Sequence, residues 1–335
     1  MNILVTGGTG FIGSHTCVAL LAAGHTVLIV DNLHNSRVEV IENIQHIAGK
    51  TVAFYALDVS DESAMRGVFD VHPIDGVIHF AGYKAVGESV EKPLMYYANN
   101  VNSTLTLAKL CVEYNVPKFV FSSSATVYGE NVSPLKETLE LRRTTNPYGE
   151  TKAMSERILT DVAKAYPNFA VTLLRYFNPV GAHESGLIGE APNGIPNNLM
   201  PYITKVAKGE LEKLNVFGND YPTIDGTGVR DYIHVMDLAE GHVAAIEHMQ
   251  TGVELYNLGT GKGTSVMQLI SAFEEANGLM IPYEIVERRP GDSAECYADT
   301  TKANTILNWH AKRTLQDMCR DAWNFENNNF VIEKL

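Results

Sequence analysis

Cysteine is scarce in this chain of 335 residues. The four cysteines, Cys17, Cys111, Cys296 and Cys319, lie far apart and form no C-x-x-C pair. This spacing excludes a disulfide framework and a cysteine-based zinc site, and it favours a reducing compartment. Basic residues are also few: 26 Lys and Arg stand against 39 Asp and Glu, for a formal net charge of -13. Because such a charge repels phosphate backbones and anionic lipid surfaces, we expect neither a nucleic-acid partner nor a membrane partner.

Long apolar runs are missing as well. The first apolar run, at residues 3–5, stops at a glycine cluster. No run approaches the roughly 18 apolar residues of a membrane helix. We therefore expect no secretory signal and a cytoplasmic location. The histidines are scattered, and His183-Glu184 lacks the H-E-x-x-H spacing, so we expect no metal site.

Short β-branched segments alternate with longer segments of helical periodicity through the first half of the chain. The predicted strands are residues 2–6, 26–30, 52–56, 76–80, 118–122 and 170–175. The predicted helices between them are residues 10–23, 100–114 and 148–165. This order is typical of a doubly wound parallel α/β sheet of the Rossmann type.

The amino-acid composition of the sequence changes at residue 178. Gly, Pro and Asn crowd residues 178–201, which predicts a long loop. The segments that follow are strands at 214–217 and 283–286 and helices at 235–248 and 266–276. We therefore predict a Rossmann domain at residues 1–177, with returning segments near 230–265. A smaller α+β domain is predicted to comprise mainly residues 178–335.

The first chemical motif, a G-x-x-G-x-x-G run, lies between the first predicted strand and its helix. It reads Gly7-Gly8-Thr9-Gly10-Phe11-Ile12-Gly13. Glycine permits a tight turn and a close backbone approach, so a pyrophosphate can rest on the amide-rich start of the helix. An ordinary glycine turn is the alternative, but the strand-turn-helix context favours dinucleotide binding. The contacts predicted from this motif are Gly7, Gly10, Phe11, Ile12 and Gly13.

An acidic residue, Asp31, ends the second strand 18 residues after Gly13. Its carboxylate can accept hydrogen bonds from both hydroxyls of an adenosine ribose and would repel a 2′-phosphate. Because Asn32 and Leu33 follow in place of a basic residue, we predict NAD rather than NADP. Asp58, at the end of the next strand, is predicted to contact the adenine or to cap a helix, and the two roles are compatible.

The second motif is a tyrosine and a lysine four residues apart, Tyr148 and Lys152, at the start of a predicted helix. One helical face presents both side chains. A tyrosine keeps its proton near pH 7 unless a cation is close, and Lys152 and a positive nicotinamide ring can supply that charge. Ser124, at the end of the preceding strand, can bridge Tyr148 and a substrate hydroxyl. We predict these three residues as catalytic, although Y-x-x-x-K alone often occurs by chance.

A second glycine-rich segment, residues 259–265, is superficially similar to a P-loop. Gly263 follows Lys262 at the position where a P-loop has a Ser or Thr to bind magnesium. We therefore interpret the segment as a turn before a helix.

The glycine loop, Asp31, the strand-end serine and the Tyr-Lys pair resemble, in this chain order, the extended short-chain dehydrogenase/reductase family. Four longer runs resemble its UDP-galactose 4-epimerase branch and span nearly the whole chain. They are HFAGYKAVGES (79–89), SSSATVYG (122–129), LRYFNPVGA (174–182) and GVRDYIHV (228–235).

The resemblance implies an isomerase of galactose metabolism that interconverts UDP-galactose and UDP-glucose with NAD. The sugar would be oxidised at C4, turned over as the 4-keto sugar and reduced again from its other face. The resemblance also implies a homodimer through helices near 94–114 and 148–165. A small residue, Cys296, four residues after Asp292, implies that UDP-GalNAc and UDP-GlcNAc are also substrates.

Further ligand contacts follow from the resemblance alone. The additional cofactor contacts are Asn32, Asn35, Ser36, Val59, Phe80, Ala81, Gly82, Lys84, Asn99 and Phe177. The UDP-hexose contacts are Asn178, Asn198, Leu199, Phe217, Arg230, Tyr232, Arg289, Asp292 and Cys296. Phe217 would contact the uracil and Asp292 the uridine ribose, while Arg230 and Arg289 would bind the phosphates and give an acidic protein a basic pocket. For each arginine alone, a surface ion pair is the alternative.

Two other functions stay open. A nucleotide-sugar 4,6-dehydratase or decarboxylase of the same fold would carry an acidic residue before the Val-Tyr-Gly of residues 127–129, where this chain has Ser-Ala-Thr. A non-catalytic NAD-sensing protein would have no reason to retain both Tyr148 and Lys152.

Overall fold

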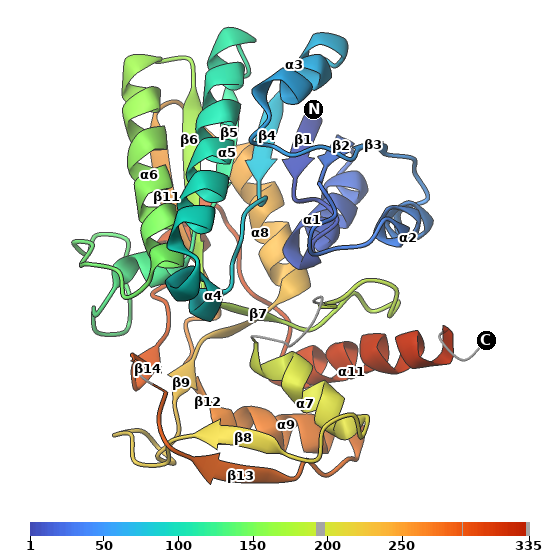
Figure 1. Ribbon diagram of the computed structural model, residues 1–335, viewed down its shortest axis with the longest axis vertical. Helices are drawn as coiled ribbons and strands as arrows, with labels where there is room; N and C mark the ends of the chain where they lie inside the picture. The colour runs from blue at the N-terminus through green and yellow to red at the C-terminus, as the bar shows by residue number, and fades with distance from the viewer. Residues whose placement is uncertain (192–197, 290, 333–335) are drawn as a thin grey trace.

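The computed structural model describes residues 1–191, 198–289 and 291–332 (Figure 1). A seven-stranded sheet, with the order β11-β6-β5-β4-β1-β2-β3, is parallel throughout. Its strands are β1 (Asn2–Thr6), β2 (Thr26–Val30), β3 (Ala53–Tyr55), β4 (Gly76–His79), β5 (Lys118–Ser122), β6 (Ala170–Tyr176) and β11 (Val253–Leu258). The chain order reverses between β1 and β4, which creates a crevice at the carboxyl ends of these strands. The predicted doubly wound Rossmann sheet is confirmed.

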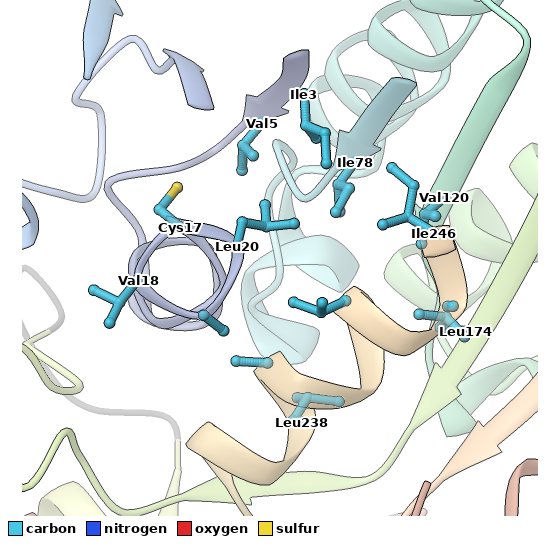
Figure 2. Close-up of a cluster of buried hydrophobic side chains, with 14 of the residues drawn as sticks. Ile3, Val5, Cys17, Val18, Leu20, Ile78, Val120, Leu174, Leu238 and Ile246 are labelled. Carbon is cyan, nitrogen blue, oxygen red and sulfur yellow. The ribbon is translucent and has the colours of Figure 1, made fainter. Parts of the chain in front are cut away.

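Helices cover both faces of this sheet because its strands are apolar on both sides. Ile3 and Val5 pack under the helices of one face, whereas Leu4 between them packs under the helices of the other. The first face carries α1 (Phe11–Ala22), α2 (Glu39–Ala48) and α8 (Val235–His248). The second face carries α3 (Glu62–Val71), α5 (Pro93–Glu113) and α6 (Pro147–Ala165). Figure 2 shows the first layer, where Leu20 of α1 and Ile246 of α8 lie against the strands.

Two helix starts matter for the site. The helix expected from residue 100 begins at Pro93, whose ring suits the first helical turn. A short helix, α4 (Val86–Glu91), precedes it. The start of α6 is fixed by Asn146, whose side chain accepts a hydrogen bond from the Gly149 N–H at 2.9 Å.

The lower part of the molecule in Figure 1 has its own core, formed by α7, α9 and α11 against β8. Its helices are α7 (Leu199–Ala207), α9 (Val266–Asn277) and α11 (Leu315–Ile332), whereas α10 (Thr301–Ile306) packs against β11 of the large sheet. Its strands are β7 (Asn178–Val180), β8 (Leu214–Phe217), β9 (Val229–Arg230), β10 (Tyr232–His234), β12 (Thr264–Ser265), β13 (Tyr283–Val286) and β14 (Glu295–Cys296). They form the small sheets β10-β7, β12-β9-β14 and β13-β8.

The prediction of a long loop at residues 178–201 is partly wrong. It begins with β7, which pairs in parallel with β10, and it gives way to α7 at Leu199. Residues 192–197 of this segment lie outside the described residues. The domain boundary at 177/178 stays a prediction, and we propose that α8 and β11 belong to the first domain, since both pack on its sheet. Within the described ranges, no helix has the length and apolar character required to cross a membrane.

Candidate active site

A cavity of about 380 Å³ opens at the carboxyl ends of the parallel strands. It is lined by the glycine loop after β1, by residues that follow β2, β3, β4, β5 and β6, and by the first turns of α6. All predicted cofactor contacts and all three predicted catalytic residues line this one cavity. Their proposed contacts with ligands stay predictions.

The glycine loop forms a close-packed cradle at the start of α1. Gly7 has a φ of +71°, and its N–H donates to the Val30 carbonyl at 2.8 Å, which ties the turn to β2. A Cβ on Gly13 would lie 2.1 Å from the carbonyl oxygen of Gly7, so only glycine fits. The N-cap of α1 is Gly10, with no side-chain cap. No side chain at the cap therefore accepts a hydrogen bond from the first backbone N–H groups of the helix, which lie at the cavity. Free N–H groups of this kind are what an anion site requires.

Asp31 lies beside this cradle and is nearly buried. Its carboxylate accepts from the Thr9 N–H at 3.2 Å, the Leu33 N–H at 2.9 Å and the Ser36 hydroxyl at 3.2 Å. These bonds fix the orientation of the carboxylate. A carboxylate has about four acceptor positions, so capacity is left for a ligand hydroxyl.

Asp58 lines the cavity, and its contact with an adenine stays a prediction, but it does not cap a helix. Its carboxylate accepts from the Ser60 N–H at 2.8 Å, whereas α3 is capped by Asp61, which accepts from the Ala64 N–H at 3.1 Å. The prediction that Asp58 caps the helix is therefore wrong, because the cap lies three residues later, at Asp61. Burial opposes ionisation of Asp58, yet hydrogen bonds from Ser60 and Asn32 lower its pKa.

The catalytic candidates lie together because α6 starts directly below the end of β5. Burial raises the pKa of Tyr148, while a hydrogen bond with Ser124 opposes this shift. Lys152 is buried, and its Nζ donates to the Ser122 carbonyl at 2.7 Å. Burial lowers the pKa of Lys152 to about 8, and the negative charge of Glu156 opposes the decrease. The site thus holds a protonated phenol, a hydroxyl partner and a cation that can lose its proton near neutral pH.

The predicted UDP-hexose contacts fall into two groups. Asn178 and Asn198 line the cavity. Asn198 Nδ2 donates to Glu190 Oε1 at 2.6 Å, and Lys84 Nζ donates to the same oxygen at 3.1 Å. The other predicted contacts lie outside the lining: Leu199, Phe217, Arg230, Tyr232, Arg289, Asp292 and Cys296.

Five of these outer residues form a cluster of their own. Asp292 lies between two guanidinium groups, 3.6 Å from Arg230 and 2.9 Å from Arg289. The Arg289 guanidinium lies 4.8 Å from the centre of the Phe217 ring. Burial raises the pKa of Tyr232 to about 12, and the charges of Arg230 and Arg289 oppose the increase. A bound diphosphate would have to compete with Asp292 for the two arginines.

Cys296, in β14, lies beside that cluster, as the register partner of Arg230 in β9. It packs against a buried group that includes Tyr128 and Phe177, and Phe177 lines the cavity. Cys296 does not itself line the cavity.

Several lining residues were not predicted from the sequence. They are His34, Leu57, Tyr83, Val86, Ser103, Ser122, Thr126, Tyr176, Pro179, Glu190 and Ala191. Tyr176, which hydrogen-bonds with Ser122, directly precedes Phe177 in a recognised motif and could have been found from it. Glu190 could not, because its partner Lys84 is 106 residues away in the chain.

The second glycine-rich segment contains a turn, as predicted. The N–H groups of Thr260 and Gly261 donate to the carboxylate of Asp231, which is fully buried. Ser265 then caps α9. The amides that would hold a phosphate in a P-loop thus already have a protein acceptor. Among residues 1–191, 198–289 and 291–332, no group of three or more His, Cys, Asp or Glu side chains is arranged to hold a metal ion.

The sequence matches the model of the NAD dependent epimerase/dehydratase family over residues 3–259. The chain belongs to this family. A curated member, UDP-glucose 4-epimerase of Bacillus subtilis (strain 168), is 56% identical over 332 residues, which cover 98% of each chain.

Solved structures of family members have the same fold. UDP-glucose 4-epimerase from Bifidobacterium longum, in complex with NAD+ and UDP, is 55% identical, with a TM-score of 0.95 over 98% of this chain and 99% of that chain. UDP-Glc/GlcNAc 4-epimerase from Campylobacter jejuni is 36% identical, with a TM-score of 0.85 over 98% of this chain and 99% of that chain.

Proposed function

We propose that this enzyme interconverts UDP-galactose and UDP-glucose with NAD as its resident cofactor. The observation that carries the proposal is that Tyr148, Ser124 and Lys152, the last fixed by its hydrogen bond to the Ser122 carbonyl, line the same cavity as the glycine cradle. The similarity to UDP-glucose 4-epimerases over nearly the full chain supports the same function.

The described residues fit NAD. The cradle at Gly7, Gly10 and Gly13 leaves room for a pyrophosphate and none for side chains, and Asp31 can accept from a ribose diol. NAD, when bound, supplies the acceptor and donor for the hydride of C4.

The protein's part is to move one proton and to hold the sugar. Tyr148 takes the proton of the C4 hydroxyl, with Ser124 aligning that hydroxyl, and Lys152 supplies the positive charge that favours the phenolate. After the 4-keto sugar has turned over, Tyr148 returns the proton on the opposite face. The proposed contacts of Arg230 and Arg289 with the diphosphate leave the sugar free to rotate while the nucleotide stays bound.

The surroundings of Ser124 argue against elimination chemistry. The nearest side chain of the following turn is Thr126, whose hydroxyl donates to Ser124 Oγ at 3.0 Å. A 4,6-dehydratase requires a further acid/base group there. A non-catalytic NAD sensor would not require the buried Lys152.

The proposed function is tested by turnover without added cofactor. Because each cycle returns its hydride, the purified protein is expected to retain NAD and to convert UDP-galactose into UDP-glucose with no nicotinamide supplied. Chromatography of the sugars measures conversion, and denaturation of the protein releases the NAD for quantification. A stable keto sugar as product, or consumption of one NAD per sugar, would contradict an epimerase.

Substrate breadth is predicted to depend on the size of residue 296. We expect the wild-type enzyme also to epimerise UDP-GlcNAc and UDP-GalNAc. In Cys296→Tyr, kcat/KM for the N-acetylated pair is expected to fall by at least about tenfold relative to the glucose pair, because the larger side chain fills space that the N-acetyl group would need. Cys296→Ser keeps the small size and is the control. Equal loss for both sugar pairs in the Tyr variant would rule out a size effect.

A homodimer through α5 and α6 is our proposal for the assembly. These two helices pack side by side, and α5 exposes Leu94 and Leu105, which are 83% and 45% accessible. Exposed apolar side chains on one face favour a self-complementary contact. Light scattering at micromolar concentration is expected to give twice the chain mass for the wild type and the chain mass for Leu105→Glu. A monomeric wild type would contradict the proposal.

We place the enzyme in the cytoplasm. All four cysteines are free thiols, and Cys17, Cys111 and Cys319 are buried. Unpaired cysteines suit a reducing compartment.

A further inference from the structure

We propose that Glu156 is a positioning residue of the epimerisation: paired with Arg175, it holds Ser123 and thereby orients Ser124 and the Lys152 ammonium for Tyr148. This inference rests on the proposed function. It concerns residues behind the cavity, since neither Glu156 nor Arg175 lines it.

The ion pair between Glu156 and Arg175 is deeply buried. The two side chains are only 5% and 4% accessible. Arg175 Nε donates to Oε1 of Glu156 at 2.9 Å, and Nη2 donates to Oε2 at 2.5 Å, in a two-pronged contact. A buried ion pair contributes little net stability compared with apolar residues of the same shape, so its presence next to the site calls for another role.

The third partner of this ion pair is the central serine of the strand end. Side chains alternate along an extended strand, so Ser122 and Ser124 face the cavity while Ser123 points away from it. The Ser123 hydroxyl donates to Glu156 Oε1 at 2.5 Å. Its N–H donates to the Leu174 carbonyl at 2.8 Å. The side-chain and backbone contacts of Ser123 together fix the position of residues 122–124.

Residues 122–124 also hold the side chain of Lys152 in place. The lysine Nζ donates to the Ser122 carbonyl, and Glu156 follows Lys152 by one helical turn on the same face. The ionisable groups around the lysine are Tyr148 and Glu156 of α6, His79 of β4, and Arg175 and Tyr176 of β6. Of these, Glu156 supplies the negative charge that opposes the decrease in the pKa of Lys152 caused by burial.

Arg175 is in turn held by Tyr128 and Asn257. The Arg175 guanidinium lies 4.7 Å from the centre of the Tyr128 ring, and the Tyr128 hydroxyl donates to Asn257 Oδ1 at 2.7 Å. Asn257 belongs to β11. The ion pair therefore joins α6, β6, β11 and the serine segment into one rigid support.

The first test compares two buried serines. Ser123→Ala removes the hydroxyl bound to Glu156 without leaving a charge unpaired. Ser155→Ala is the matched control, because Ser155 is equally buried on α6, its hydroxyl bonds to Thr104, and neither of these two residues lines the cavity. In the NAD-loaded protein, kcat for UDP-galactose is expected to fall about tenfold in Ser123→Ala with KM unchanged, and by less than about twofold in Ser155→Ala. Equal losses in the two variants would overturn the proposal.

The second test measures Lys152 itself. The double variant Glu156→Gln, Arg175→Gln removes both charges, so no lone charge is buried. NMR of the NAD-loaded protein with ¹³C-labelled lysine, assigned through Lys152→Arg, follows the titration of this ammonium. Its midpoint is expected to fall by about one pH unit in the double variant. An unchanged midpoint would overturn the proposal. If the wild type fails to epimerise UDP-galactose, the proposed function is wrong, and this titration still decides the role of Glu156.

Discussion

Replacing Tyr148 with phenylalanine is expected to lower kcat for UDP-galactose by about 10²- to 10⁴-fold, the usual contribution of a positioned acid/base group. The ring and its packing are kept, and only the hydroxyl that bonds to Ser124 is lost. Because the proposed diphosphate contacts at Arg230 and Arg289 lie outside the cavity lining, the affinity for UDP is expected to change by less than about twofold. Steady-state kinetics and titration calorimetry with UDP measure the two effects.

The matched control is Tyr166→Phe. Tyr166 lies at the other end of the same helix and is half exposed, so the loss of its hydroxyl should leave kcat unchanged. Should Tyr148→Phe retain half of the wild-type kcat, a different group must take the proton. Should it lose UDP affinity as well, the variant would report damage to the fold rather than to proton transfer.

Gly13→Ala is expected to eliminate retention of NAD. The new Cβ would lie 2.1 Å from the carbonyl oxygen and 2.9 Å from the carbonyl carbon of Gly7. Backbone atoms cannot move aside as a flexible side chain does, so α1 must shift away from the turn. We expect the NAD content of the purified protein to fall at least about tenfold and the free energy of unfolding to fall by about 1–3 kcal/mol. Quantification of released NAD and denaturant unfolding check both numbers.

Gly67→Ala is the control for this substitution. Gly67 lies inside α3, and a Cβ there meets no atom within 4 Å. This alanine is expected to add about 0.5–1 kcal/mol of stability and to leave the NAD content unchanged. Full NAD content in Gly13→Ala would show that the cradle does not determine binding of the cofactor.

The sheet and the cofactor side of the cavity could be predicted because their signals are local. Parallel strands buried on both faces appear as short, continuous apolar runs, and Asp31 and Ser124 follow such runs directly. The start of α5 could not be predicted. Asn100 faces inward there, where its Oδ1 accepts from the Tyr83 N–H, so a polar residue occupies a buried helical position and interrupts the apolar period.

Long-range contacts account for most of what the sequence did not reveal. Asp58 and Asp61 are equally good helix caps by residue type, and only the backbone selects Asp61. Arg230, predicted to bind phosphate, is paired with Asp292, and this pairing depends on where β9 lies relative to a loop some 60 residues later. Position in the chain identifies such residues as candidates, but only the folded backbone determines which partner each one meets.

The return of the chain to its first sheet has a consequence for synthesis on the ribosome. Strand β11 pairs in parallel with β6, although 76 residues lie between the end of β6 and the start of β11. Until α8 and β11 have emerged, the side chains of Ile78 and Val120 lack the helix that covers them. A nascent chain that ends near residue 230 therefore displays an open sheet edge and an apolar face together, the combination that promotes aggregation. Binding of a chaperone to ribosome-held chains should be strongest at that length and should decline once residue 258 is outside the exit tunnel.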